Sequence, residues 1–110
     1  MNPRDKPLVW LHGEVKTPPF GPAARLEAGY LLRKLQAGEL LAMPQARPMP
    51  EIGARCYELR ITDAGAMWRL VYRIDADAIV IVDVVCKKTP KTPEGILNRC
   101  RQRLLEYDNA

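Results

Sequence analysis

The chain has 110 residues, which is enough for one domain with a single hydrophobic core and too few for two. Its hydrophobic and charged fractions, 47% and 27%, are ordinary for a globular protein and exclude an intrinsically disordered chain. A net charge of +4 is compatible with nucleic acid as a ligand, but this mild excess is common among proteins of other functions. Residues 1–110 are therefore expected to form one globular domain.

The cysteines and the apolar runs indicate the cellular compartment. Cys56, Cys86 and Cys100 are odd in number and lack CxxC spacing, and two of them lie within apolar patterns. They predict reduced, buried thiols rather than disulfides or a zinc site. No apolar run approaches the ~20 residues that cross a bilayer, and the N-terminus lacks a signal-peptide pattern. We therefore predict a cytoplasmic protein.

The first predicted elements are a short strand and a helix. Residues 7–11 form an apolar run that predicts a strand. Pro22 can begin a helix, since its missing N–H would have no partner in the first turn, and Gly38 is a plausible stop. Between them, a helix is predicted over residues 23–37, because apolar residues recur there in steps of three and four. This stripe comprises Ala24, Ala28, Leu31 and Leu35, widened by Tyr30 and Leu32.

A proline-rich passage follows the helix. Residues 40–53 contain three prolines and can hold at most a short helical turn. We interpret this passage as a connecting loop that wraps one edge of the sheet.

Three consecutive antiparallel strands are predicted between residues 56 and 88, with turns at residues 62–65 and 75–77. In the first two strands, Tyr57, Leu59, Ile61, Trp68, Leu70, Tyr72 and Ile74 alternate with Glu58, Arg60, Arg69, Val71 and Arg73. Because side chains along a strand have a period of two, one sheet face is apolar and the other collects arginines. Such a face favours a binding surface for something anionic.

The third strand of this meander, residues 79–87, is nearly all β-branched and should be central and covered on both faces. Asp83 interrupts the run, on the same parity as Ile79 and Ile81. A partly buried carboxylate needs a partner, and Arg69 or Arg73 on a neighbouring strand is the natural candidate.

A closing helix is predicted to run to about residue 107. Thr92 is a good N-cap and Pro93 a good first helical residue. Leu97, Cys100, Leu104 and Tyr107 would line one face of this helix, and Arg99 and Arg103 another. The fold class is therefore α+β. We expect a curved, mainly antiparallel sheet, made of the N-terminal strand and the meander, with the helices packed on one face and the charged face open.

Several kinds of chemistry are disfavoured by composition. One histidine and three scattered cysteines make no metal-ligand set, so neither a metal nor a cofactor is expected. Neither a Walker A nor a GxGxxG pattern occurs, and the chain contains no serine. Cysteine–histidine catalysis would require His12 to lie beside a cysteine that the patterns bury.

Metal-free RNA cleavage fits the charged face better. Attack of a ribose 2′-hydroxyl on phosphorus needs a base, cations on the phosphate oxygens and a proton donor for the leaving oxygen. Guanidinium groups match phosphate geometry through paired donors. The face is expected to gather Glu58, Arg60, Arg69, Arg73 and Lys87, with Lys88 and Lys91 at its rim. The alternative is a solvated face whose ion pairs cancel and stabilise little.

The segments CYELRITDAGAMWRLVYRID and VIVDVVCKKTPKTP, together with the opening WLHGEVKTPPF, carry a resemblance that covers nearly the whole chain. The chain resembles the RelE/ParE toxin superfamily and is especially similar to its phage-derived, HigB-like branch. The resemblance implies the toxin of a type II toxin–antitoxin pair. It further implies metal-independent cleavage of mRNA on the ribosome, neutralised by a cognate antitoxin with a helix-turn-helix domain. Operator DNA would be contacted only through the antitoxin.

The resemblance also implies roles for individual residues. Arg69 matches the phosphate-binding arginine of the family, and Glu58 and Arg60 lie where the family carries basic catalytic side chains. Lys88, together with Lys87, takes the place of a basic residue after the last strand. Apart from the resemblance, the pattern of the charged face predicts Arg73, Lys87 and Lys91 as substrate contacts. The chain departs from the pattern because it has no histidine near the closing segment and its only tyrosine there is Tyr107. This departure leaves Glu58 as a base and Lys88 or Lys91 as a donor.

Two other functions stay open. A non-enzymatic ParE-like toxin of the same fold would poison gyrase, and the shared fold cannot decide between the two because function lies in the site. The third reading is a plain basic RNA-binding domain.

Overall fold

The structure, a computed structural model, describes residues 4–17, 19–87, 89 and 91–110. The elements, in chain order, are β1 (Leu8–Trp10), α1 (Pro22–Gln36), β2 (Ala46–Pro48), β3 (Cys56–Asp63), β4 (Ala66–Ile74), β5 (Ile79–Lys87) and α2 (Glu94–Asp108). The strands form one sheet in the order β1-β5-β4-β3-β2. β1 pairs with β5 in parallel and the other neighbours are antiparallel, which confirms the predicted α+β class with a mainly antiparallel sheet.

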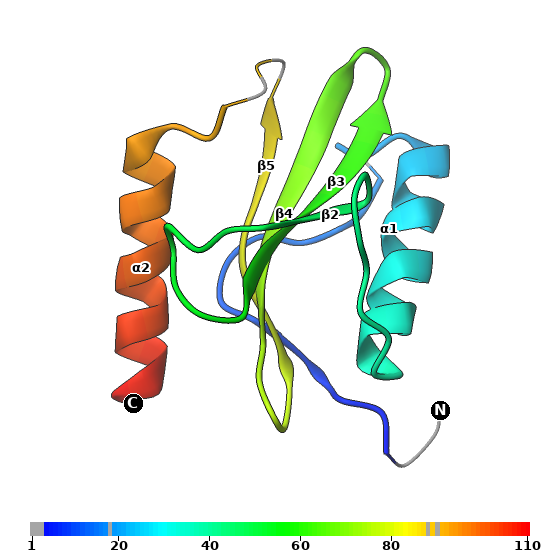
Figure 1. Cartoon of the computed structure of the whole chain (residues 1–110). Helices are drawn as coiled ribbons and strands as arrows, with labels where there is room; N and C mark the ends of the chain where they lie inside the picture. The colour runs from blue at the N-terminus through cyan, green and yellow to red at the C-terminus, as the bar shows by residue number, and fades with distance from the viewer. Residues whose placement is uncertain (1–3, 18, 88, 90) are drawn as a thin grey trace.

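The helices lie on opposite faces of this sheet (Figure 1), so the expectation that both pack on one face, with the charged face open, is wrong. The reason lies in the side chains that the second face presents. Val71, Val80 and Val82 are apolar positions there, and they pack against the stripe Leu97, Cys100 and Leu104 of α2. The end of the charged face beside the N-terminus of α2 nevertheless remains accessible, and the candidate site lies there.

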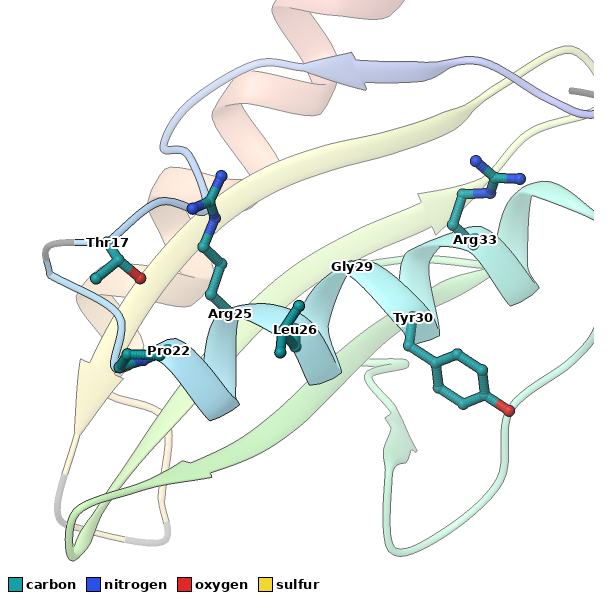
Figure 2. A pocket seen from close by; sticks show the side chains of 7 residues that line it. All are labelled: Thr17, Pro22, Arg25, Leu26, Gly29, Tyr30 and Arg33. Atoms are coloured by element: carbon teal, nitrogen blue, oxygen red, sulfur yellow. The ribbon is translucent and has the colours of Figure 1, made fainter.

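α1 follows its sequence pattern closely, with one exception. It begins at Pro22 and ends before Gly38, whose φ of 93° lies in the left-handed region that favours glycine. The predicted stripe is buried against the sheet. Tyr30, however, does not widen that stripe: it is 62% exposed and lies on the outer side of the helix, as Figure 2 shows.

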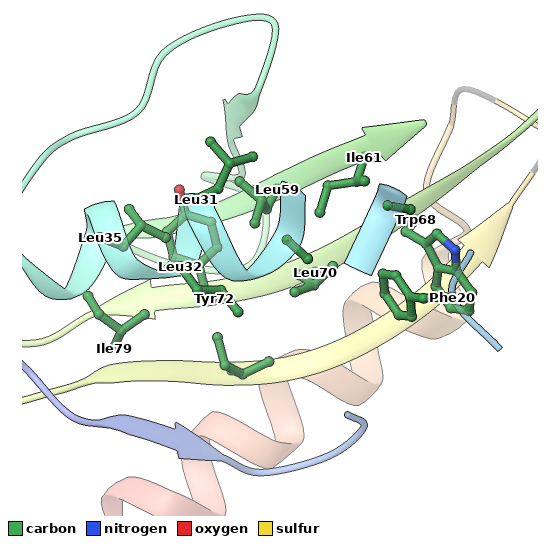
Figure 3. Packing of buried hydrophobic residues seen from close by; sticks show 13 residues of the cluster. Phe20, Leu31, Leu32, Leu35, Leu59, Ile61, Trp68, Leu70, Tyr72 and Ile79 are labelled. Atoms are coloured by element: carbon green, nitrogen blue, oxygen red, sulfur yellow. The ribbon is translucent and has the colours of Figure 1, made fainter. Parts of the chain in front are cut away.

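The first core lies between α1 and the apolar face of β3, β4 and β5 (Figure 3). Leu31, Leu32 and Leu35 of the helix pack there, and the Phe20 ring stacks on Trp68 with centroids 3.9 Å apart. The strand side is supplied by Leu59, Ile61, Trp68, Leu70, Tyr72, Ile79 and Ile81. The period-two assignment of the apolar face is therefore confirmed.

A β-bulge changes the parity of β5. Val71 pairs with Asp83 whereas Tyr72 pairs with Ile81, so Val82 is an extra residue between the two pairs. The bulge places Asp83 on the face that α2 covers, not with Ile79 and Ile81 as predicted.

Because of the bulge, Asp83 forms ion pairs with residues other than the predicted Arg69 or Arg73. Its Oδ2 lies 2.6 Å from Nη2 of Arg99 and 3.2 Å from Nη1 of Arg103, both on α2. The predicted partners are engaged elsewhere: Arg69 pairs with Glu58, and Arg73 with Asp75. Since Asp83 is buried, the ion pair fixes α2 against β5.

The proline-rich passage after α1 wraps the sheet edge as expected, but it also contributes a strand that the sequence did not predict. β2 pairs with residues 57–59 of β3, and its last residue is Pro48, a residue type that edge strands tolerate. β5 is internal and covered on both faces, as predicted.

Asp63, at the end of β3, ties the chain before α1 to the sheet. Its Oδ2 accepts hydrogen bonds from the backbone N–H of Gly21 and from Nε1 of Trp68, both at 2.8 Å. The Gly21 bond, and then the Trp68 bond, hold the pKa of this carboxyl below its usual 3.8. The stabilisation is therefore complete above pH 3.8 and is lost as the pH falls through the lowered pKa.

We expect Asp63→Asn to be less stable than the wild type at pH 7 and to lose less of its stability on acidification. Urea unfolding of both proteins between pH 7 and pH 2 measures this. Parallel pH profiles for the two proteins would contradict the expectation.

Candidate functional site

The centre of the charged face is a buried ion pair between neighbouring strands. Nη1 of Arg69 on β4 lies 2.9 Å from Oε1 of Glu58 on β3, and both residues are at most 1% exposed. Alternation along the two strands brings these side chains to the same face. A paired and hydrogen-bonded carboxylate is what makes a buried guanidinium tolerable.

The loop between β5 and α2 closes over this pair. Nη2 of Arg69 donates to the carbonyl oxygen of Thr89 at 2.7 Å, and the Thr92 hydroxyl donates to Oε2 of Glu58 at 2.8 Å. The prediction that Thr92 is the N-cap of α2 is therefore wrong. The N-cap is Pro93, and the helix begins at Glu94. The buried carboxylate, unsatisfied without a second donor, draws the hydroxyl inward.

Arg60 and Arg69 face each other directly across the β3–β4 ladder. Like charges in this position destabilise a sheet, and Glu58 offsets them here, with its Oε1 at 3.9 Å from Nε of Arg60. Within the described part of the chain, Nε of Arg60 and Nε of Arg69 are buried and have no hydrogen-bond partner. The two guanidinium groups therefore keep a positive charge that the neighbouring Glu58 carboxylate offsets only in part.

Lys87, the last residue of β5, brings a third cation to this place. It pairs with Met67 in the ladder, two residues from Arg69 along β4. Its Nζ is buried and has no hydrogen-bond partner among the residues that the structure describes. Burial, and next the charge of Arg69, lower the pKa of this ammonium from its usual value.

The three cations line one hollow of about 260 Å³. It lies at the end of the sheet where β5 ends and the β3–β4 hairpin turns (Figure 1). The remaining lining is Thr62, Gly65, Ala66, Met67 and Thr89, so none of the described lining residues is acidic. We call it the cationic hollow. Its size and charge suit a phosphate group with an attached sugar better than a large organic ligand.

The other predicted site residues lie elsewhere. Arg73 is on the same face but at the far end of the sheet, where it binds Asp75 and Asp108. Those carboxylates raise its pKa and occupy its donors. Lys91 lines a different hollow of about 400 Å³, which Arg47 of β2 also lines. Lys88 is outside the described residues.

Sequence reasoning missed the threonines. Thr92 is 34 residues from Glu58, and the alternation of a strand says nothing about a loop that folds back over it. Arg47 was missed because its strand was expected to be a loop. The KKTPKTP segment was singled out for its basic residues, whereas its described contacts to the ion pair come from Thr89 and Thr92.

No group of three or more histidine, cysteine, aspartate or glutamate side chains in the described residues is placed to hold a metal ion. Cys56, Cys86 and Cys100 are free thiols; Cys56 and Cys100 are buried as predicted, but Cys86, near the end of β5, is exposed, so the prediction of buried thiols is wrong there. No described helix is long and apolar enough to span a membrane.

A comparison with protein families decides the class of this molecule. The model of the phage-derived protein Gp49-like family matches residues 20–105, from the end of the first loop to the last turn of α2. The chain belongs to the Gp49-like family. This is a RelE/toxin-like family of phage-derived proteins associated with toxin–antitoxin systems.

Gp49-like membership confirms the toxin-like class inferred from the sequence motifs, and it implies an antitoxin as a partner. The matched residues include the strands β2, β3, β4 and β5 and all described residues that line the cationic hollow. No curated protein and no solved structure matches the chain.

Proposed function

We propose that this Gp49-like protein is the toxin of a type II toxin–antitoxin pair and cleaves mRNA on the ribosome without a metal ion, as in the HigB-like branch. The observation that carries this proposal is the cationic hollow, where Arg60, Arg69 and Lys87 converge with no described acidic residue in the lining. A pentacoordinate phosphorus gains negative charge during attack by the 2′-hydroxyl, and fixed cations stabilise that charge. A cytoplasmic site of action follows from this target.

Arg60 and Lys87 would contact the scissile phosphate. Their side chains border the hollow, and both residues are partly exposed. Arg69 donates from both of its terminal nitrogens, to Glu58 and to Thr89, and its Nε is buried, so it would not contact the substrate directly. It acts as a fixed positive charge at the floor of the hollow.

Glu58 would position Arg69. Each of its oxygens accepts a hydrogen bond, from Arg69 and from Thr92, and the residue has no exposed surface. The role of base expected from the family position would require the carboxylate to leave these partners. Orientation of the guanidinium needs no such movement.

Lys87 would supply the proton for the leaving 5′-oxygen. A donor transfers its proton more readily as its pKa falls toward the working pH, and that of Lys87 is lowered by burial and by Arg69. Lys88 and Lys91 on the following loop are the further expected cations, which would hold the RNA backbone beside the hollow.

Replacement of Arg60 by alanine tests the proposal without removing the buried ion pair. We expect roughly 100-fold slower mRNA cleavage, because one phosphate donor is lost. Primer extension on mRNA from a cell-free translation reaction maps and counts the cuts. Arg101→Ala is the matched control, since that arginine lies on α2 and binds Glu94 and Asn98. A wild-type protein that stops translation without any cut would refute the nuclease assignment.

A gyrase-directed toxin is the second candidate, favoured because none of the described residues that line the hollow is an aromatic proton-transfer group. The only tyrosine of the closing segment, Tyr107, lies beside Arg73 at the other end of the sheet, 6.0 Å from its guanidinium carbon. Supercoiling by purified gyrase distinguishes the candidates. Inhibition with accumulated cleaved DNA would support the gyrase target, and unchanged supercoiling at high toxin concentration would count against it.

A further inference from the structure

The outer face of α1 carries two large side chains that neither core uses. Leu26 is 76% exposed and Tyr30 is 62% exposed. They line a shallow apolar groove that runs along the helix from Pro22 to Arg33, on the side turned away from the sheet (Figure 2). This groove, the α1 groove, is separate from the cationic hollow, with which it shares none of its described lining residues.

Gly29 lies in the middle of the groove. A glycine in a helix interior destabilises the helix relative to alanine. The fold gives no reason for this one: a Cβ at Gly29 would meet no atom within 4 Å, and its backbone is helical. Because Gly29 has no side chain, the surface has a depression beside Leu26 and Tyr30. Another chain can approach the helix backbone closely there.

The rim of the groove is positively charged. Arg25 and Arg33 border it on one side, and Tyr30 points to the other (Figure 2). Nζ of Lys34 lies 4.9 Å from the centre of the Tyr30 ring. The only acidic residue of α1, Glu27, lines a different hollow with Arg60. The charge complementary to this rim is therefore negative.

Charge also decides between occupants. A second copy of this chain would set Arg25 and Arg33 against the same residues, and like charges brought together disfavour a complex. An amphipathic helix with one apolar ridge and flanking carboxylates complements both the groove and its rim. Such helix-in-groove contacts use anchors at the spacing of one helical turn, as Leu26 and Tyr30 are spaced here.

We propose that the α1 groove is the docking surface for an acidic amphipathic helix of the antitoxin. An apolar side chain of that helix lies over Gly29 between Leu26 and Tyr30, and its carboxylates pair with Arg25 and Arg33. The inference relies on the proposed function only for the existence of the antitoxin, and not for the chemistry at the cationic hollow.

Gly29→Ala gives the sharpest test, because stability and binding should change in opposite directions. The probe is the product of the reading frame beside this chain's gene, purified separately and titrated into this protein by calorimetry. We expect Gly29→Ala to raise the melting temperature by roughly 4 °C, as a helix-stabilising change in a small domain does. The added methyl group should weaken binding of the probe at least tenfold.

Two charge-introducing variants complete the experiment. Leu26→Glu should weaken binding about 100-fold, while Leu40→Glu, at an equally exposed leucine outside the groove, should bind as the wild type does. Higher salt should weaken the wild-type complex, since the rim pairs are exposed. All of these variants should cut mRNA as the wild type does, so their cleavage activity separates this inference from the proposed function.

Three outcomes would overturn the inference. The probe fails to bind the wild type, it binds Gly29→Ala and Leu26→Glu as tightly as the wild type, or Leu40→Glu weakens binding as much as Leu26→Glu does. Loss of ribosome binding by Leu26→Glu with the probe complex intact would assign the groove to the ribosome instead.

Discussion

Replacing Arg69 with alanine should lower the free energy of unfolding by about 3–5 kcal/mol, because Glu58 would remain as a buried charge without its partner. A domain of this size is stable by only about 5–15 kcal/mol, so the variant would be close to unfolding at physiological temperature. Urea unfolding followed by tryptophan fluorescence measures the change, since Trp68 lies in the same strand.

The matched variant removes both charges together. The double variant Glu58→Met with Arg69→Met replaces the ion pair by apolar groups. We expect it to recover most of the stability that Arg69→Ala loses, because apolar replacements of buried ion pairs are often neutral or stabilising. The double variant should still cut no mRNA, because the fixed charge at the floor of the hollow is gone. Arg25→Ala, at an exposed position, should change stability by less than about 0.5 kcal/mol. An Arg69→Ala protein as stable as the wild type would mean that the pair is open to solvent.

Lys87→Met should stabilise the protein and abolish cleavage. The buried Nζ lacks a described partner, so removing it is expected to raise the free energy of unfolding by about 1 kcal/mol at pH 7. Loss of the proton donor and of one phosphate contact should slow cleavage by more than about 100-fold. A stability gain with loss of function is typical of residues that are kept for chemistry.

The pH dependence of Lys87→Met checks the same point independently. Between the lowered pKa of Lys87 and its usual 10.5, the unfolded chain binds a proton that the folded chain does not. Raising the pH through this window therefore stabilises the wild type, and the variant should lack that gain. Cleavage by the wild type should fall in the same window, as the donor loses its proton. Wild-type and variant stability curves that run parallel up to pH 10.5 would contradict the role given to Lys87.

The sequence predicted well what depends on local period. Alternation along β3 and β4 assigned the apolar face correctly, and the spacing of Ala24, Ala28, Leu31 and Leu35 identified the buried side of α1. Pro22 and Gly38 marked the ends of that helix because their backbone preferences act within one residue.

Two of the failures share a physical cause, since each depends on contacts between distant residues. The extra residue Val82 shifts the face of Asp83, and nothing in the local pattern of β-branched residues announces a bulge. Thr92 had the right chemistry for a helix cap, but a buried carboxylate 34 residues earlier competes for its hydroxyl. The misplacement of Tyr30 has a local cause instead: at 3.6 residues per turn it lies on the side of α1 almost opposite the buried stripe, where it is exposed.

The candidate site was predicted in part. Glu58, Arg60, Arg69 and Lys87 were expected on one face, and the structure brings the four together; their catalytic roles stay predictions. Arg73 was expected beside them, yet Asp75 and Asp108 hold it at the opposite end of the sheet. A strand pattern gives the face of a side chain, whereas its position along the strand relative to covering elements requires the fold.

The parallel pairing of β1 with β5 has a consequence for synthesis of the protein. Leu8 pairs with Ile79, so the first strand has no partner until most of the chain has been made. The ion pair at the hollow likewise receives the Thr92 hydroxyl only after β5 is complete, and Arg73 binds Asp108 only after α2 is complete. Long-range contacts of this kind form late, because loop closure must precede them. A nascent chain therefore cannot assemble the cationic hollow until β5 and the residues up to Thr92 have left the ribosome that makes it.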